Sequence, residues 1–278
     1  MSNEPLLIRA SEAGKLMIGG NTITESQLRD LEVLQYRKDH EGEKDRNEKT
    51  IAPLTPKMEE ERLFLIAKRD APFELGATAK SLIRDIWLRR EFGYDEPVMT
   101  PQLFKGLLCE QDSIGVVSRQ LPATEFRVKN MNAYRDEFFS GNPDVILASE
   151  DTVEDLKTSW TVKTFVEATV PEEYYGQGQV YMHLTGMKHF RLIYVLVDTP
   201  AELVLEEHKR FFFKFGADDE NPHYQEACEK LDRMHYPSRF IPEEKRIKVF
   251  SFDYDPEYIA ELARRVIVAR EYYATLKL

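Results

Sequence analysis

The chain has 278 residues, 42% of them hydrophobic, which is enough to bury a sizeable core in one large domain. Its formal net charge of −11 at pH 7 excludes broad wrapping of nucleic acid, because neutralising phosphates needs Lys and Arg along the whole path. No apolar run approaches the roughly 20 residues that span a bilayer, and residues 1–4 do not begin a secretory signal, so we expect a cytoplasmic protein with no membrane partner.

The first part of the chain, residues 1–95, is predicted to be helical and strongly charged. Apolar residues recur at helical spacing over 24–39, 56–70 and 76–93, and Thr24 with Gln27 forms a capping-box pattern. We expect this part to be a helical hairpin or lid that belongs to the same domain as the rest of the chain.

The second part, residues 96–278, changes character. Thr100 and Pro101 begin a predicted helix that runs to residue 120. Short strands are predicted next, at 124–130, 134–140, 143–149 and 153–159, followed by a helix at 172–187, strands at 190–198 and 246–252, and a C-terminal helix at 255–276. This order predicts an α/β fold with a mixed sheet.

Acidic side chains lie within two neighbouring predicted strands. Asp144 precedes the apolar run Val145-Ile146-Leu147, and Asp155 and Lys157 lie on the next strand. If the turn is at 149–150, residues whose numbers sum to 299 are paired, and Asp144 lies opposite Asp155 with Cα atoms about 4.5–5.5 Å apart. Two carboxylates at that distance repel unless a cation lies between them or one carboxyl is protonated, and a divalent cation would remove the conflict. Lys157 would share the face of Asp155.

A second register is compatible with the same residues. If the turn is at 150–151, paired numbers sum to 301, and Asp144 faces Lys157 in an ion pair that needs no metal. The spacing does not choose between the two registers.

The order of the motifs resembles the PD-(D/E)xK nuclease superfamily, and within it the phage lambda exonuclease and viral-recombinase-type exonucleases. Pro143-Asp144 is followed after about ten residues by Asp155-Leu156-Lys157, with KGLLCE on the preceding predicted helix and QGQVYM on the following one. The resemblance covers roughly residues 99–198. It implies a restriction-endonuclease-like core, in which a central mixed sheet is flanked by helices, with an N-terminal helical extension.

The resemblance implies specific roles for the residues that match. Asp144, Asp155, the backbone carbonyl of Leu156, and Glu110 would bind one or two Mg²⁺ or Mn²⁺ ions through oxygen. Lys157 would orient the attacking water.

Gln177 and Tyr181 match a Gln-x-x-x-Tyr element that positions the nucleophile and the DNA strand. They share a helix face because they are four residues apart. The plainer interpretations are a solvated Glu110, an exposed Gln177 and a core Tyr181.

A weaker match near the N-terminus concerns DNA ends. Ser11 is predicted to cap a helix over 11–17, whose free N–H groups suit a 5′-phosphate, although a plain helix cap is an equally good interpretation. The family pattern has an arginine seven residues before that serine, where this chain has Glu4. Arg9 or Lys15 would have to replace it, and Lys80 and Arg84 are further candidates for DNA contact.

Together these features predict a Mg²⁺-dependent deoxyribonuclease, an exonuclease that trims linear duplex ends in phage-type recombination or repair inside a bacterial host. The resemblance also implies a homotrimer and a single-strand annealing protein as partner. An endonuclease or a Cas4-like processing nuclease would share the core, but the two cysteines, Cys109 and Cys228, are too few for the cysteine cluster of the latter. A catalytically silent DNA-end-binding protein would not need all four of Glu110, Asp144, Asp155 and Lys157.

Overall fold

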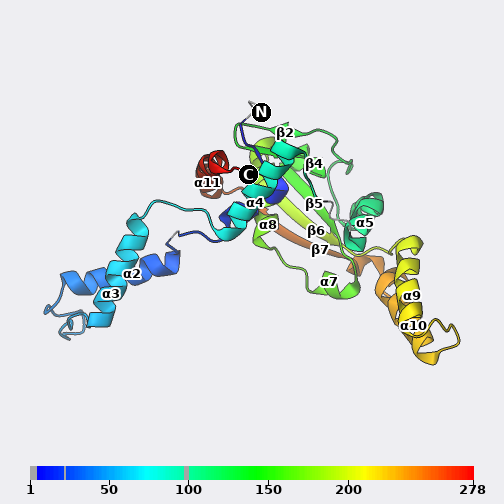
Figure 1. The fold of residues 1–278 in the computed structure, drawn as a ribbon, viewed down its shortest axis with the longest axis horizontal. Coiled ribbons are helices and arrows are strands. Elements are labelled where there is room, and N and C mark those ends of the chain that lie inside the picture. The colour runs from blue at the N-terminus through cyan, green and yellow to red at the C-terminus, as the bar shows by residue number, and fades with distance from the viewer. Residues whose placement is uncertain (1–4, 22, 97–99) are drawn as a thin grey trace.

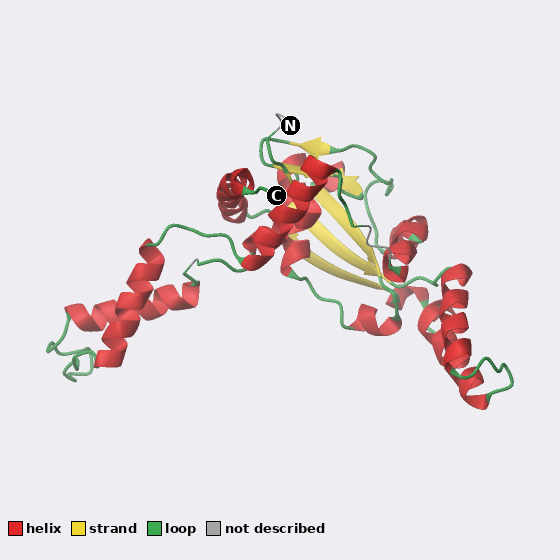
Figure 2. Ribbon diagram, in the orientation of Figure 1, coloured by secondary structure: helices red, strands yellow, loops and turns green. Residues whose placement is uncertain are grey.

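Two helical hairpins project from opposite ends of a central α/β body (Figures 1 and 2). The computed structural model describes residues 5–21, 23–96 and 100–278. Helices α2 (Glu25–Asp39) and α3 (Pro56–Asp70) form one hairpin, and α9 (Ala201–Lys214) and α10 (Pro222–His235) form the other. None of the described helices is long and apolar enough to cross a membrane.

A four-stranded mixed sheet forms the centre of the body. Its strands lie in the order β4 (Val145–Leu147), β5 (Thr152–Thr158), β6 (His189–Val195) and β7 (Ile247–Asp253). The middle pair β5–β6 is parallel, and the two outer pairs are antiparallel. The predicted mixed sheet is therefore confirmed.

The register of β4 on β5 is the first of the two that the sequence allowed. Val145 pairs with Glu154 and Leu147 with Thr152, so paired numbers sum to 299, and the alternative register is wrong. A short 3₁₀ turn at Ala148–Glu150 joins the strands and ends at Asp151, which has a positive φ of 51°. Aspartate tolerates this left-handed conformation better than most residues.

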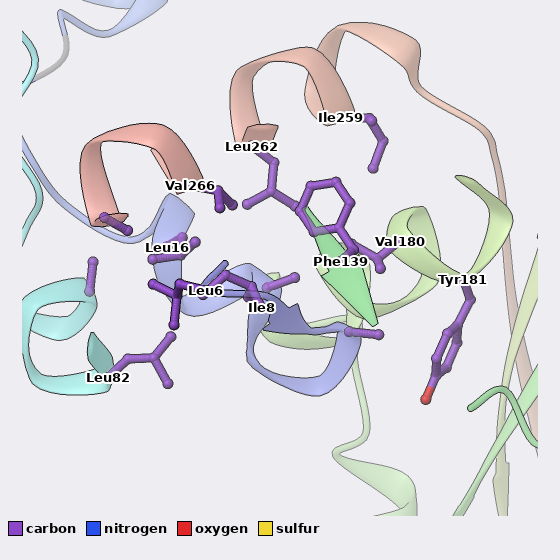
Figure 3. Packing of buried hydrophobic residues seen from close by; sticks show 14 of the residues in the cluster. Leu6, Ile8, Leu16, Leu82, Phe139, Val180, Tyr181, Ile259, Leu262 and Val266 are labelled. Carbon is purple, nitrogen blue, oxygen red and sulfur yellow. The ribbon is translucent and has the colours of Figure 1, made fainter. Parts of the chain in front are cut away.

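Helices cover both faces of the sheet. On one face, α1 (Ala10–Met17), α4 (Ala77–Phe92), α8 (Glu172–Thr185) and α11 (Pro256–Thr275) pack around the main core. Figure 3 shows this core, with Phe139 and Leu262 near its centre and Tyr181 at its margin. On the other face, α6 (Glu110–Gln120) packs Val116 and Val117 against Ile193 and Val195.

Helices α1 and α8 approach each other closely at two glycines. A Cβ atom on Gly14 would lie 2.4 Å from the backbone oxygen of Glu172, and one on Gly176 would lie 2.7 Å from Gly14. Only residues without a Cβ permit this contact. It places the middle of α1 beside the N-terminal part of α8.

The N-terminal 95 residues divide between the main body and one hairpin. The capping box of Thr24 and Gln27 is confirmed, and α2 and α3 bury a small cluster of their own around Leu31, Leu34 and Leu65. Helices α1 and α4 instead belong to the main core.

Three predicted elements differ from the structure. The helix expected from Thr100 to residue 120 is broken at Cys109 into α5 (Pro101–Leu108) and α6, a one-residue change of direction that apolar periodicity does not reveal. Residues 124–130 form no strand and pair with β4 only through the bridge between Lys129 and Val145. The strand expected at 134–140 is replaced by β2 (Tyr134–Arg135) and β3 (Phe139–Gly141).

These two short strands belong to a second sheet, in which β3 lies between β2 and β1 (Ile8–Arg9). The hairpin of α9 and α10 has no counterpart among the predicted elements. The small helix α7 (Val162–Val166) follows β5.

Candidate active site

A cavity of about 660 Å³ opens between α5, β5 and α8. Every residue that the sequence predicted for the catalytic centre lines it: Glu110, Asp144, Asp155, Leu156, Lys157, Gln177 and Tyr181. Much of the remaining wall is apolar or aromatic and includes Leu103, Leu107, Trp160, Tyr174 and Tyr194. Of the residues that the structure describes, none before Thr100 contributes to this cavity.

Asp144 and Asp155 meet at the junction of β4 and β5. The backbone N–H of Leu156 donates a hydrogen bond of 2.9 Å to Asp144 Oδ2. Burial, together with the neighbouring Asp155 carboxylate, raises the pKa of Asp144 to about 7. Asp155 is 2% exposed, and its Oδ2 lies 2.7 Å from Lys157 Nζ without the geometry of a hydrogen bond. That oxygen has no hydrogen-bond partner among the described residues.

Lys157 is held by groups on two elements. Its Nζ donates to Gln177 Oε1 at 3.1 Å and lies 4.5 Å from the centre of the Tyr174 ring. Burial by itself would lower the pKa of Lys157, but the Asp155 carboxylate outweighs burial and raises that pKa. Lys157 therefore stays protonated at neutral pH.

Gln177 connects the acidic and phenolic groups of the cavity. Its Nε2 donates to Asp155 Oδ1 at 3.3 Å and to Tyr181 Oη at 3.0 Å. Burial raises the pKa of Tyr181, so the phenol keeps its proton. Because the phenol oxygen accepts from Gln177, its own O–H is available to another acceptor. The plainer interpretation of an exposed Gln177 is wrong, since Gln177 is buried.

Glu110 enters the cavity because of the break at Cys109. It is the first residue of α6, and its carboxylate forms an ion pair with Lys129. Lys129 was not among the predicted site residues, although the Arg127-Val128-Lys129 alternation within an extended segment was a signal that could have identified it.

The oxygen ligands of this cavity are chemically suited to a hard divalent cation, but they are not arranged around a common point in the metal-free protein. Three carboxyl groups line one cavity, and oxygen ligands are those that Mg²⁺ and Mn²⁺ prefer. In the described parts of the chain, however, no three Asp, Glu, His or Cys side chains are grouped closely enough to hold an ion. Glu110 is engaged by Lys129, and Asp155 by Lys157.

A second cavity of about 540 Å³ adjoins the first, and Tyr181 lines both. Arg9, Ser11 and Arg135 line it, and no Asp or Glu of the described chain does. A Cβ on Gly141 would lie 2.8 Å from the Tyr181 ring, so this glycine lets β3 approach α8. Arg135, which the sequence did not single out, adds a second guanidinium.

The expected capping role of Ser11 is wrong. Helix α1 begins at Ala10, its N-cap residue is Arg9, and no side chain caps it. The reason is that Ile8 and Arg9 pair with β3, so the chain enters the helix one residue before Ser11.

The other three predicted DNA contacts lie elsewhere. Lys15 borders a separate depression together with acidic residues, including Asp85 and Glu96. Lys80 and Arg84 lie on α4 and line neither of the two adjoining cavities.

A buried lysine supports the cavity wall. Lys105 on α5 is 0% exposed, and its Nζ donates to the Trp160 backbone oxygen at 3.1 Å. Burial lowers the pKa of Lys105 to about 8. The ring of His235, on α10, packs edge-on against Trp160. Sequence patterns gave no signal for this cluster, because its members come from distant segments.

Solved structures share this fold. A phage-related exonuclease from Haemophilus somnus 129PT superposes with a TM-score of 0.63 at 20% sequence identity, over 97% of this chain and 94% of its own. An alkaline exonuclease, LHK-Exo, from Laribacter hongkongensis matches 72% of this chain and 81% of its own, with a TM-score of 0.47 and 13% identity. No protein-family profile and no curated protein matches the chain. The restriction-endonuclease-like fold, and the resemblance to phage exonucleases at the level of the fold, are confirmed.

Proposed function

We propose that this protein is a metal-dependent DNA exonuclease that hydrolyses phosphodiester bonds from duplex ends, in phage-type recombination or repair. The observation that carries the proposal is the convergence of all seven predicted catalytic residues on one cavity. They come from three separate stretches of the chain, and their chemistry is that of phosphodiester hydrolysis. The fold shared with a phage-related exonuclease supports the same class of reaction.

The metal would be held by Asp144, Asp155, the backbone carbonyl of Leu156 and Glu110. Bound Mg²⁺ or Mn²⁺ would supply Lewis acidity toward the phosphate and lower the pKa of a water. The three carboxyl groups that line one cavity support this assignment, because oxygen is the ligand that these cations prefer. Glu110 joins the set only when its pairing with Lys129 is given up.

The chain's own groups then orient the reactants. Protonated Lys157 donates hydrogen bonds to the attacking water and offsets negative charge that develops on the phosphate. Gln177 fixes the position of Lys157 and of Asp155 through its two ends. The Tyr181 O–H, left free by its bond from Gln177, donates to a phosphate oxygen between the two cavities.

The second cavity suits a terminal phosphate of the strand being degraded. Two guanidiniums from Arg9 and Arg135, with the hydroxyl of Ser11, offer charge-assisted donors, and no carboxylate opposes them among the described lining residues. Because Tyr181 lines both cavities, a phosphate held here would place the next linkages near Asp144. This adjacency supports action at ends.

An endonuclease of the same fold is the second candidate. The N-terminal helices were expected to form a helical hairpin or a lid. No described residue before Thr100 lines the catalytic cavity, and the α2–α3 hairpin projects away from it (Figure 1). The chain as a monomer therefore does not enclose the site, and an open site accepts internal stretches of DNA.

Digestion of end-labelled linear duplex beside a covalently closed circle, with Mg²⁺ and with EDTA, tests the proposal. We expect the linear duplex to be degraded with Mg²⁺ only, and the circle to survive. Ready cutting of the circle would replace exonuclease by endonuclease. If neither substrate is cleaved with Mg²⁺, the remaining interpretation is a catalytically silent DNA-end-binding protein. A binding assay with phosphorylated ends would then test that interpretation.

A further inference from the structure

Lys129 is fixed beside the catalytic strands by its backbone. It pairs with Val145 in an isolated antiparallel bridge, and the next residue, Asn130, donates its N–H to the Asp144 carbonyl at 2.7 Å. Two residues earlier, Arg127 donates to Glu154 at 2.7 and 3.1 Å in a fully buried pair. The main chain around Lys129 is therefore anchored to β4 and β5, and only its side chain is free to change partner.

Charge is distributed unevenly among the three carboxylates of the cavity. Asp155 lies against Lys157, and Glu110 is paired with Lys129. Asp144 accepts its hydrogen bond from a backbone N–H and has no ion pair with a described lysine or arginine. Two lysine ammonium groups thus face three carboxyl groups, and the Glu110 carboxylate is occupied before any metal arrives.

We propose that Lys129 is an exchangeable counter-ion: it holds Glu110 in the metal-free protein, releases it to a divalent cation, and then binds a phosphate of the DNA. The proposal rests on the proposed function, because it requires the metal and the DNA. A double charge competes for the Glu110 carboxylate better than a single one, and a flexible lysine stem lets the displaced ammonium reach a new anion.

The exposure of the pair permits this exchange. The side chains of Lys129 and Glu110 are 33% and 26% exposed, so either can be resolvated while it changes partner. The Arg127 and Glu154 side chains are only 1% and 0% exposed, so separating this pair would leave two buried charges without a partner. The same short segment therefore carries one permanent ion pair and one replaceable pair.

Metal binding without DNA is the first test. Mn²⁺ affinity is measured by calorimetry on the full chain, as wild type, Lys129→Met and Lys129→Arg. We expect Lys129→Met to bind Mn²⁺ about three- to tenfold more tightly, because Glu110 no longer has a competing cation, and Lys129→Arg to stay near wild type. Lys188→Met is the matched control, since Lys188 pairs with Asp151 and lines neither cavity.

DNA binding is the second test, with a short duplex in EDTA and in Ca²⁺. Lys129→Met should weaken binding about fivefold or more in Ca²⁺ and reduce the slope of log affinity against log salt by about 0.9, the loss of one phosphate contact. In EDTA the effect should be under about twofold. Glu110→Gln in EDTA should free Lys129 and tighten DNA binding.

Unchanged or weaker Mn²⁺ affinity in Lys129→Met would overturn the proposal, and so would equal losses of DNA affinity in EDTA and in Ca²⁺, which indicate a fixed contact. The proposed function is judged separately by wild-type digestion of linear duplex. The wild type could degrade DNA with Mg²⁺ while Lys129→Met matches wild type in both binding tests. That result would support the proposed function and reject the counter-ion role of Lys129.

Discussion

Asp144, the residue directly before edge strand β4, accepts a hydrogen bond from the main-chain N–H of Leu156 on the neighbouring strand, at 2.9 Å. The bond exists because the two strands pair in the register that places Asp144 opposite Asp155. Slipping the strands by one residue would move every side chain of β4 to the other face. Register, more than any single contact, therefore brings the two carboxylates together.

Asp144→Asn is expected to abolish Mg²⁺-dependent cleavage while stabilising the metal-free protein at pH 8 by about 1–2 kcal/mol. The amide still accepts from Leu156, and it removes a buried charge whose ionisation is opposed by burial and by Asp155. Urea unfolding of both proteins in EDTA measures the difference. A clear loss of stability would mean that the Asp144 charge is compensated by a group other than Leu156.

Asp155→Asn should also abolish cleavage, but it should destabilise the fold. The Asp155 carboxylate faces Lys157 at 2.7 Å, and its removal leaves a partly buried ammonium without its counter-charge. We expect a cost of about 1–3 kcal/mol in the same urea experiment. Equal stabilities for the two variants would contradict the different partners that the two aspartates have.

Lys157→Ala should lower turnover about a hundredfold or more without loss of Mn²⁺ affinity, because the variant removes a cation from beside the Asp155 carboxylate. Lys157 is held by Gln177 and, in the proposed mechanism, acts on the reacting groups, so its loss should raise mainly the free energy of the transition state. Single-turnover rates at saturating metal, beside calorimetric Mn²⁺ titration, separate the two effects. Turnover near that of wild type would exclude Lys157 from the mechanism.

Metal affinity should depend on pH through Asp144. Its carboxyl, with a pKa raised to about 7, must lose a proton to bind a cation, so Mn²⁺ affinity should rise about tenfold per pH unit below 7 and level off above. The metal-free fold binds more protons than the unfolded chain between about pH 4 and 7, so this group's contribution to stability falls as pH rises through that window. Asp144→Asn should flatten both profiles.

The mixed sheet and the shared face of Asp155 and Lys157 were predictable because they depend on short-range patterns. A turn between two apolar runs fixes which residues pair, and the Asp-Leu-Lys spacing puts Asp155 and Lys157 on one face of β5. The sequence left two registers open because both turns are chemically acceptable. The two registers differ by two residues, which keeps every side chain on the same face, so the apolar pattern could not distinguish them.

Long-range contacts account for what was not predicted. Lys129 pairs with Glu110, and Arg135 lines the same cavity as Arg9, through folding of segments with no shared periodicity. The α9–α10 hairpin has an amphipathic pattern interrupted by charge and turns, and it buries few residues, Val204 and Leu231 among them, in the described chain. Ser11 was wrongly predicted as a helix cap because the strand before the helix has only two residues, too few to show an apolar periodicity.

Recognition of phosphorylated ends should depend on the second cavity. The double variant Arg9→Ala/Arg135→Ala removes both guanidiniums and leaves every catalytic residue in place. We expect a 5′-phosphorylated duplex, degraded about tenfold faster than a 5′-hydroxyl duplex by wild type, to lose most of that advantage. Rates on the 5′-hydroxyl duplex should change less than about threefold, because no terminal phosphate is there to be bound.

Lys80→Ala/Arg84→Ala is the matched control, since it removes two positive charges from α4, outside both cavities. If nonspecific electrostatic attraction to DNA governed the end preference, both double variants would lose the preference equally. Both would also degrade the 5′-phosphorylated and the 5′-hydroxyl duplex more slowly, by the same factor. If the cavity binds the terminal phosphate, only the Arg9/Arg135 variant loses the preference, and Ser11→Ala shows a smaller loss in the same direction. Preference retained in all three variants would assign the end phosphate to another surface and leave the cavity beside Tyr181 without that role.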